Sequence, residues 1–319
     1  MTMMTQENEA RLKALQGQEL PPESRVPAWI RTMVRNPTSV IGLILLFLFI
    51  LIAILAPVLA PPKIPSQPFF MTRDGFEAQP QPPDAKHILG TTQGQYDIFY
   101  GVIWGTRTAF EVGLIVTGAT VLVGGGLGAA FAYLGGAADE VFQRIVELFL
   151  AFPFLLAALT MATILGPKIR NGLITGMIAL IIFGWPGYAR LIRGDILSIK
   201  EREYIIAARM VGVPGWRILV RHILPNAMYS LLVVASLDIG TNVLTFASLS
   251  FLGVGAPQGY ADWGQLLSFA RNWIPNLSTY WYIVVYPGIA LLLFVLAWNL
   301  IGDAFRDALD PKLRGEGRR

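Results

Sequence analysis

Two carboxylates stand inside otherwise apolar stretches of the chain, and they are the residues best placed to do chemistry. Asp238 lies in one long apolar run and Glu111 in another. A charged side chain at the centre of a bilayer costs about 2.5–3.5 kcal/mol, so each should face a cavity or a polar partner. Such residues suit a translocation path or a proton relay, and Asp238 equally suits a polar contact between helices. Both interpretations of Asp238 stay open on these grounds.

The sequence has few residues that could support other kinds of chemistry. The chain has no cysteine, which excludes disulfides, thiolate metal sites and a cysteine nucleophile. His87 and His222 are its two histidines and fall on opposite sides of the expected membrane, so His87 is interpreted as a hydrogen-bonded turn residue rather than a metal ligand. No GxxxxGK[ST] loop occurs, and the glycines at 124, 125, 126 and 128 lie in an apolar run where close helix packing explains them. We therefore expect no catalytic residue, no metal site and no cofactor.

The elements that must position the carboxylates are long apolar helices. Hydrophobic residues make up 54% of the chain and charged residues 14%, against roughly 25% in soluble proteins. Val40 to Leu59 contains no charge, and twenty helical residues at about 1.5 Å each span a hydrocarbon core. The expected fold class is an all-α polytopic membrane protein with six transmembrane helices. The expected spans are residues 40–60, 107–134, 141–165, 173–193, 226–252 and 280–302.

The order of these segments predicts the organisation of the chain. The region 61–106 is rich in proline in its first half and is expected to be a large irregular external loop. The other expected parts are a cytoplasmic N-terminal segment 1–39, a first helix 40–60, a five-helix core 107–302 and a cytoplasmic C-terminal tail 303–319. Eighteen Lys and Arg would lie on the side of the termini and seven on the other, which places both termini in the cytoplasm of a cell membrane. Anionic lipid explains the basic charge, and nucleic acid need not be invoked.

A charged segment between two apolar spans is the most unusual feature of the sequence. Ser198 to Glu201 fits a capping box, and Gly212 followed by Pro214 fits a helix stop, so a short helix is expected between them. A helix of about ten residues is unstable alone and needs a surface to dock on. It would lie in the cytoplasmic loop 194–224, with Ile206 and Met210 on one face. The residues alone leave two interpretations open, docking on a partner protein or lying on lipid.

Three motifs of this sequence carry a resemblance. Ala207-Ala208-x3-Gly212 followed by Leu224-Pro225 resembles the EAA loop of permease subunits of binding-protein-dependent ABC importers. The segment SLSFLGVG from Ser248 is similar to the dipeptide and oligopeptide (nickel) branch of that family, and NLIGDAFRDALDPKLR from Asn299 to its C-type subunit. The resemblance implies the type I ABC importer permease fold, with the short helix seated in a cleft of an ATPase. The residues it assigns to this coupling are Glu203, Ile206, Ala207, Ala208, Arg209 and Gly212.

The resemblance also implies an assembly and a cargo. A homologous second permease, two ABC ATPase subunits, an external or periplasmic solute-binding protein and the lipid membrane are the expected partners. The chain would form half of a path for short peptides, with Asp238 and Glu111 as candidate lining residues. Departures from the branch pattern at Thr92, Gln95, Tyr96, Tyr100, Gly101 and Glu111 leave oligosaccharides or nickel complexes as alternatives. A proton-coupled secondary carrier is the alternative from a different class, although the sequence shows none of the internal repeats such carriers have.

Overall fold

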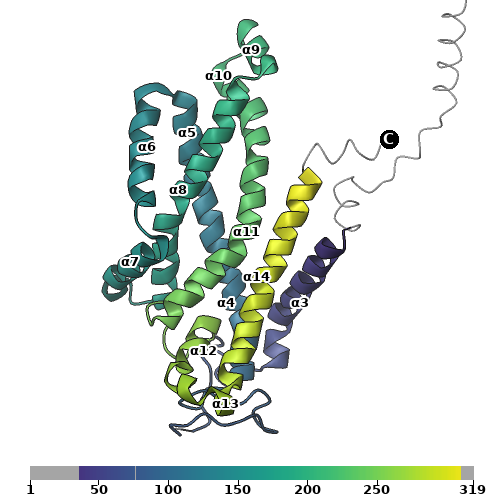
Figure 1. Ribbon diagram of the computed structural model, residues 1–319, viewed down its shortest axis with the longest axis vertical. Helices are drawn as coiled ribbons and strands as arrows, with labels where there is room; N and C mark the ends of the chain where they lie inside the picture. The colour runs from purple at the N-terminus through teal and green to yellow at the C-terminus, as the bar shows by residue number, and fades with distance from the viewer. Residues whose placement is uncertain (1–35, 76, 310–319) are drawn as a thin grey trace, which may run out of the picture.

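Long helices running side by side make up most of the molecule (Figure 1). The computed structural model describes residues 36–75 and 77–309. No strand occurs in this part of the chain, which has only three isolated β-bridges. The expected all-α class is confirmed. The cytoplasmic ends expected at 1–39 and 303–319 fall largely outside the described residues.

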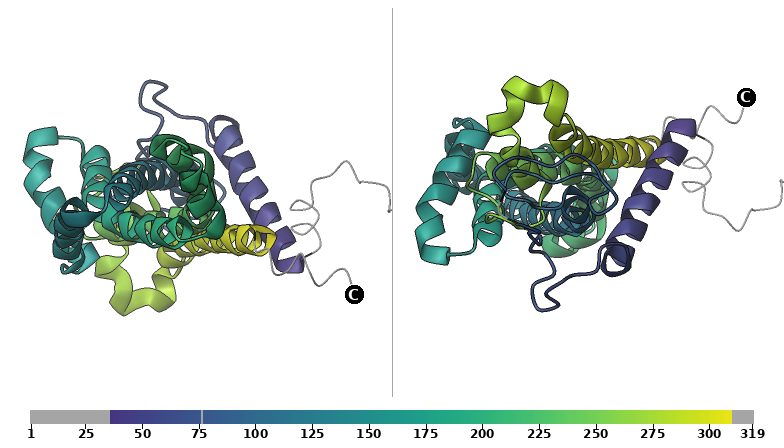
Figure 2. Two further views of the ribbon diagram at one scale, coloured as in Figure 1. Left: turned by 90° about the horizontal axis from the view of Figure 1, so that it is seen from above. Right: turned by 90° about the horizontal axis from the view of Figure 1, so that it is seen from below.

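In the described part of the chain, five helices are long and apolar enough to cross a membrane. They are α3 (Pro37–Leu59), α4 (Ile98–Thr120) continued through a π-helical turn η1 (Val121–Gly125) into α5 (Gly126–Leu134), α8 (Gly172–Lys200), α10 (Gly215–Ile218) continued through η2 (Leu219–Ile223) into α11 (Leu224–Phe251), and α14 (Tyr282–Leu309). Seen from above and below, the purple α3 lies at the edge of the bundle beside the yellow α14 (Figure 2).

The expected span 141–165 is not one helix. The structure has α6 (Gly136–Leu150) and α7 (Phe154–Ile169), bent by 86° at a short break. Pro153 lies in the break, and proline has no N–H to continue a helix and restricts the residue before it. The pair gives a sixth crossing only if both halves together form one span.

The loop expected at 61–106 is shorter than that, because α4 begins at Ile98 rather than near residue 107. Asp97 caps this helix, its Oδ1 accepting a hydrogen bond of 2.8 Å from the Tyr100 N–H. The prolines that predicted an irregular segment end at Pro83, so the sequence between Asp97 and Thr106 is free to be helical. The loop is fastened to the helices by Trp104 Nε1, which donates to the Ala60 carbonyl at 2.8 Å.

Close contacts between backbones hold the core together. Gly124 lies against α8, where an added Cβ would come within 2.1 Å of the Trp185 carbonyl oxygen. Gly128 also lies against α8, where an added Cβ would come within 2.5 Å of the Ala189 carbonyl oxygen. The packing interpretation of this glycine run is confirmed at these two positions. Gly126 instead faces open space.

Four short elements lie outside the long helices. They are α9 (Glu203–Met210), α12 (Trp263–Phe269), the 3-10 turn η3 (Arg271–Asn276) and α13 (Leu277–Tyr280). The helix α9 lies at one end of the molecule, whereas α12 and α13 lie at the other (Figure 1). These short elements therefore divide between the two ends of the molecule.

Candidate coupling helix and core carboxylates

The helix α9 projects beyond α8 and α11 at the top of Figure 1. It spans eight residues, so the expected short helix is confirmed. Its expected capping box is wrong, because Ser198 remains inside α8, which continues to Lys200. Arg202 is the N-cap instead and makes no side-chain cap bond. Local capping therefore contributes little at this end, and α9 depends on packing.

Gly212 ends α9 in the way the sequence predicts. Its φ of +78° lies in the left-handed region that favours glycine. The Gly212 N–H donates to the Arg209 carbonyl at 3.0 Å, and the Val213 N–H donates to the Ala208 carbonyl at 3.1 Å. This pair of bonds is a Schellman motif, which satisfies the last carbonyls of the helix.

One face of α9 is anchored to its own chain. Ile205 is fully buried in a cluster with residues of α5 and α8, and Ala208 packs against the same cluster. Nearby, Lys200 Nζ donates to the carbonyls of Ala132 and Tyr133 at 2.5 and 2.9 Å. Arg193 forms a two-pronged ion pair with Asp139, with a closest distance of 2.6 Å. The Ile205 cluster joins α9 to α5 and α8. The Lys200 and Arg193 contacts join α8 to α5 and α6 beside it.

The opposite face of α9 is apolar and exposed. Met210 is 83% exposed and Val211 80%, and Ile206 and Tyr204 are each nearly half exposed. Ala207 is exposed beside them, and so are Glu203 and Arg209. Trp216, at 64% exposure, extends the apolar surface onto α10. Side chains of this kind, exposed together on a small projection, are typical of a protein contact site.

The residues of this helix divide between an anchored face and an exposed face, which the sequence did not separate. Ala208 was expected on the contact face with Ala207, but it lies half-buried against its own chain. The anchor Ile205 and the exposed Val211 and Trp216 were not expected. The i, i+3 spacing of Ile205 and Ala208 was the signal for an anchoring face.

Asp238 is half-buried on α11 and has a partner on α8. The Tyr188 hydroxyl donates to Asp238 Oδ2 at 2.7 Å, across a separation of 50 residues. A second polar bond joins neighbouring helices, from Asn242 Nδ2 to Thr117 Oγ1 at 2.8 Å. A polar contact between helices, one of the two interpretations of Asp238, is therefore present.

Glu111 is half-buried on α4. Burial raises the pKa of Tyr260, and the charge of Glu111 raises it further, so the two groups lie close together. The structure does not bring Glu111 and Asp238 into one hydrogen-bonded pair among the described residues. The two carboxylates occupy separate places on α4 and α11.

Several other titratable groups at the α12 end of the molecule make structural contacts. His87 Nδ1 lies 2.7 Å from Asp97 Oδ2, and its backbone N–H bonds the Asp84 carboxylate at 2.5 Å, which confirms the turn interpretation. In residues 36–75 and 77–309 no cluster of three or more His, Asp or Glu could hold a metal. Asp262 caps α12 from a buried position, and burial raises its pKa to about 6.

Comparison with known proteins assigns this architecture to a family. Residues 122–315 match the binding-protein-dependent transport system inner membrane component, and residues 28–83 match the N-terminal transmembrane domain of oligopeptide transport permease C. The chain belongs to this permease family. The permease is 37% identical over 300 residues to the dipeptide transport system permease protein DppC of Alkalihalophilus pseudofirmus, covering 92% of this chain and 94% of the relative.

Other relatives and one solved structure agree with the assignment. The oligopeptide transport system permease protein OppC of Bacillus subtilis is 36% identical over 289 residues, which is 90% of each chain. The inward-facing MetNI methionine ABC transporter superposes with a TM-score of 0.55 at 17% identity, covering 66% of the permease and 97% of that chain. This likeness confirms the type I importer permease fold.

The family defines the role of the permease in general terms. It is a multi-pass inner membrane component of an ABC importer and not an enzyme. Its partners therefore include an ATPase and a solute-binding protein.

Proposed function

We propose that the permease carries short peptides across the cell membrane as one half of a permease pair. The relatives named for dipeptide and oligopeptide transport match it over about nine tenths of its length, which supports this cargo over oligosaccharides or nickel complexes. A homologous second permease and two ATPase subunits complete the membrane assembly. Asp238 and Glu111 border the path, with Asp238 held in place by Tyr188.

The exposed apolar face of α9 is the observation that carries the mechanism. Hydrolysis takes place in the ATPase subunits, so the permease must receive a mechanical signal. The helix supplies a contact surface on one face and a rigid anchor to α5 and α8 on the other. Glu203, Ile206, Ala207, Arg209 and Gly212 are the coupling residues in this proposal, and Ala208 acts as part of the anchor. Both termini and α9 lie on the cytoplasmic side.

The experiment introduces a charge into that surface. Ala207→Asp places a carboxylate on the exposed face of α9 without filling any buried space, so the protein should insert and fold normally. A charge buried against an apolar cleft costs several kcal/mol unless paired, so uptake and ATPase co-purification should fall at least tenfold. Ala138→Asp is the matched control, because Ala138 is exposed at the same end but lies on α6.

A second variant tests the shape of the helix end. Proline cannot adopt the φ of +78° found at Gly212, so Gly212→Pro should break the Schellman motif and uncouple uptake from ATP hydrolysis.

Normal uptake by the Ala207→Asp variant at normal expression would refute the coupling role. Uptake driven by a proton gradient in vesicles without ATP would instead support the secondary carrier.

A further inference from the structure

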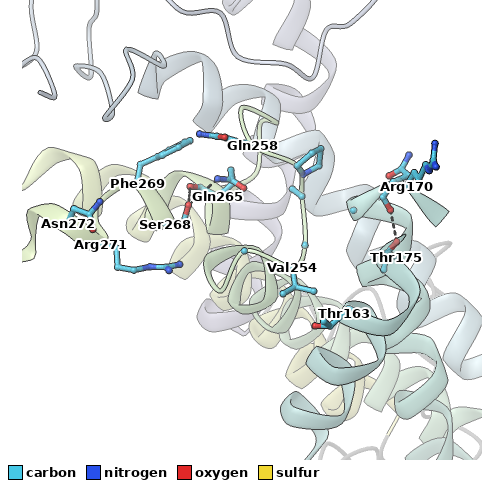
Figure 3. A pocket seen from close by; sticks show the side chains of 18 residues that line it. Thr163, Arg170, Thr175, Val254, Gln258, Gln265, Ser268, Phe269, Arg271 and Asn272 are labelled. Atoms are coloured by element: carbon cyan, nitrogen blue, oxygen red, sulfur yellow. Dashed lines mark hydrogen bonds between the residues drawn. The ribbon is translucent and has the colours of Figure 1, made fainter. Parts of the chain in front are cut away.

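A large polar pocket lies at the end of the molecule opposite α9. Its volume is about 650 Å³, within the roughly 300–1,000 Å³ typical of small-molecule sites. The C-terminus of α7, the N-terminus of α8, the 253–258 loop and the end of α12 enclose it (Figure 3). The coupling function uses none of these residues.

The charge of the pocket lining is unbalanced. Arg170 and Arg271 both line it, and no carboxylate does among the residues that the structure describes. Both guanidinium groups are permanently charged and carry five donors each. One guanidinium N–H of Arg271 donates to the Phe251 carbonyl, which leaves the other N–H groups of this side chain available to a ligand. In Figure 3 the two arginines lie at opposite ends of the pocket, with Gln265 and Ser268 between them.

Part of the remaining lining is polar, and hydrogen bonds and close contacts hold it in place. Gln265 is buried, and its Nε2 donates to Ser268 Oγ at 3.0 Å. The 253–258 loop is pressed against α8, since a Cβ on Gly172 would lie 2.2 Å from the Gly255 carbonyl oxygen. The Ala256 N–H is fixed by Ser250 Oγ at 3.0 Å. A pocket with a rigid loop in its wall and two arginines in its lining suits an anionic ligand.

We propose that this pocket is a carboxylate-recognition site, which the carboxylate-bearing cargo occupies as it enters the permease. The inference rests on the proposed function, because a short peptide always presents a C-terminal carboxylate, and on the orientation that places this end outside. Arg271 and Arg170 attract the carboxylate, and the amide and hydroxyl groups of Gln265 and Ser268 contact the rest of the molecule. An anionic lipid headgroup shares this chemistry, so the experiment must separate the two sources.

The first measurement probes the charge of the pocket without transport. Gln258 lines the pocket and is exposed, so Gln258→Cys supplies the single thiol of this cysteine-free chain. In proteoliposomes of the whole complex, an anionic methanethiosulfonate reagent should label this thiol roughly fivefold faster than a cationic one of similar size. The preference should be absent at Ser66→Cys, an exposed site on the external loop.

The second measurement assigns the preference to the arginines. Arg271→Gln and Arg170→Gln should each reduce the charge preference at least twofold, whereas Arg271→Lys should retain it. Lys168→Gln is the matched control, because Lys168 is exposed on the last turn of α7 but does not line the pocket. An unchanged preference in the Arg170→Gln, Arg271→Gln double variant would overturn the proposal.

The third measurement identifies the ligand. Alanyl-alanine should slow labelling at position 258, and its C-terminal amide should not. Protection by phosphatidylglycerol added to neutral liposomes, without protection by alanyl-alanine, would overturn the cargo assignment. Absence of dipeptide uptake with an intact charge preference would refute the proposed function alone. Normal dipeptide uptake without any charge preference would refute the carboxylate site alone.

Discussion

The bond between Tyr188 and Asp238 gives the buried carboxylate a structural role that a substitution series can measure. Asp238→Leu should leave the Tyr188 hydroxyl without its acceptor and lower the unfolding free energy by about 1–3 kcal/mol. Asp238→Asn keeps an acceptor oxygen and should cost less. Thermal unfolding of the purified complex measures both effects.

A double variant separates this bond from a role in the path. Tyr188→Phe combined with Asp238→Leu should recover much of the stability, since neither partner is then left unpaired. Asp238→Asn should change the rate of uptake more than the choice of cargo. A shift in preference between charged and neutral peptides would instead make Asp238 a selectivity element.

Asp262 predicts a pH dependence of stability. Burial raises its pKa from 3.8 to about 6, despite the bonds from Gln265 and Ser250 that favour the ionised form. Between those two values the folded chain holds more protons than the unfolded chain, so this carboxyl lowers stability as the pH rises through that window. The loss should reach about 3 kcal/mol and stay constant above pH 6.

Asp262→Asn tests this dependence because asparagine is also a good N-cap for α12. The melting temperature of the variant should exceed that of the wild type at pH 7.5, and the gap should close towards pH 4.5. Equal melting temperatures for the two proteins at both pH values would show that Asp262 is not destabilised by burial.

At the scale of elements, the glycine run between α4 and α5 offers a matched pair of substitutions. Gly124→Ala should destabilise by about 1–3 kcal/mol, because its methyl group would press on the Trp185 carbonyl and on Tyr188. Gly126→Ala, two residues on, meets open space and should be neutral or stabilising by up to about 1 kcal/mol. Thermal unfolding distinguishes them, and equal losses at both positions would contradict the close packing of α4 on α8.

Much of the element pattern could be predicted from the sequence, and the errors have physical reasons. The apolar runs predicted where the long helices lie, because a helix satisfies its own backbone hydrogen bonds inside lipid. Gly212 predicted the end of α9. The start of α4 was predicted too late, because the prolines that indicate an irregular loop occur only in the first half of that segment. The break between α6 and α7 was missed because Pro153 lies within a continuous apolar run.

The contacts of the candidate site were harder to predict from the sequence than the helices were. The position of Asp238 within an apolar run predicted a polar partner, but not Tyr188, which is 50 residues away. Likewise Arg170 and Arg271 are about a hundred residues apart, so only the tertiary arrangement of α7, α8, the 253–258 loop and α12 brings them to one pocket. Contacts within one helix follow from spacing, whereas contacts between helices follow from the tertiary arrangement.

At the scale of the whole molecule, the two ends make opposite predictions for accessibility. Ser198 lies near α9, and Gln258 lies in the loop at the other end. A membrane-impermeant thiol reagent added to intact cells should label Gln258→Cys and should label Ser198→Cys only after lysis. Labelling of position 198 from outside would invert the orientation and remove α9 from reach of any cytoplasmic ATPase.

The packing of α3 against α14 joins two helices that the ribosome produces at very different times. An added Cβ on Gly42 would lie 2.7 Å from Leu300 Cβ, and Phe49 meets Phe294 edge to face at 5.3 Å between ring centres. These are the first and last described membrane helices, so a ribosome needs tens of seconds to produce the second after the first. During that interval α3 lacks its contact with α14, although α4 already packs on it. A chain interrupted before α14 therefore leaves the α14-facing side of α3 uncovered, and the bundle cannot close along that side.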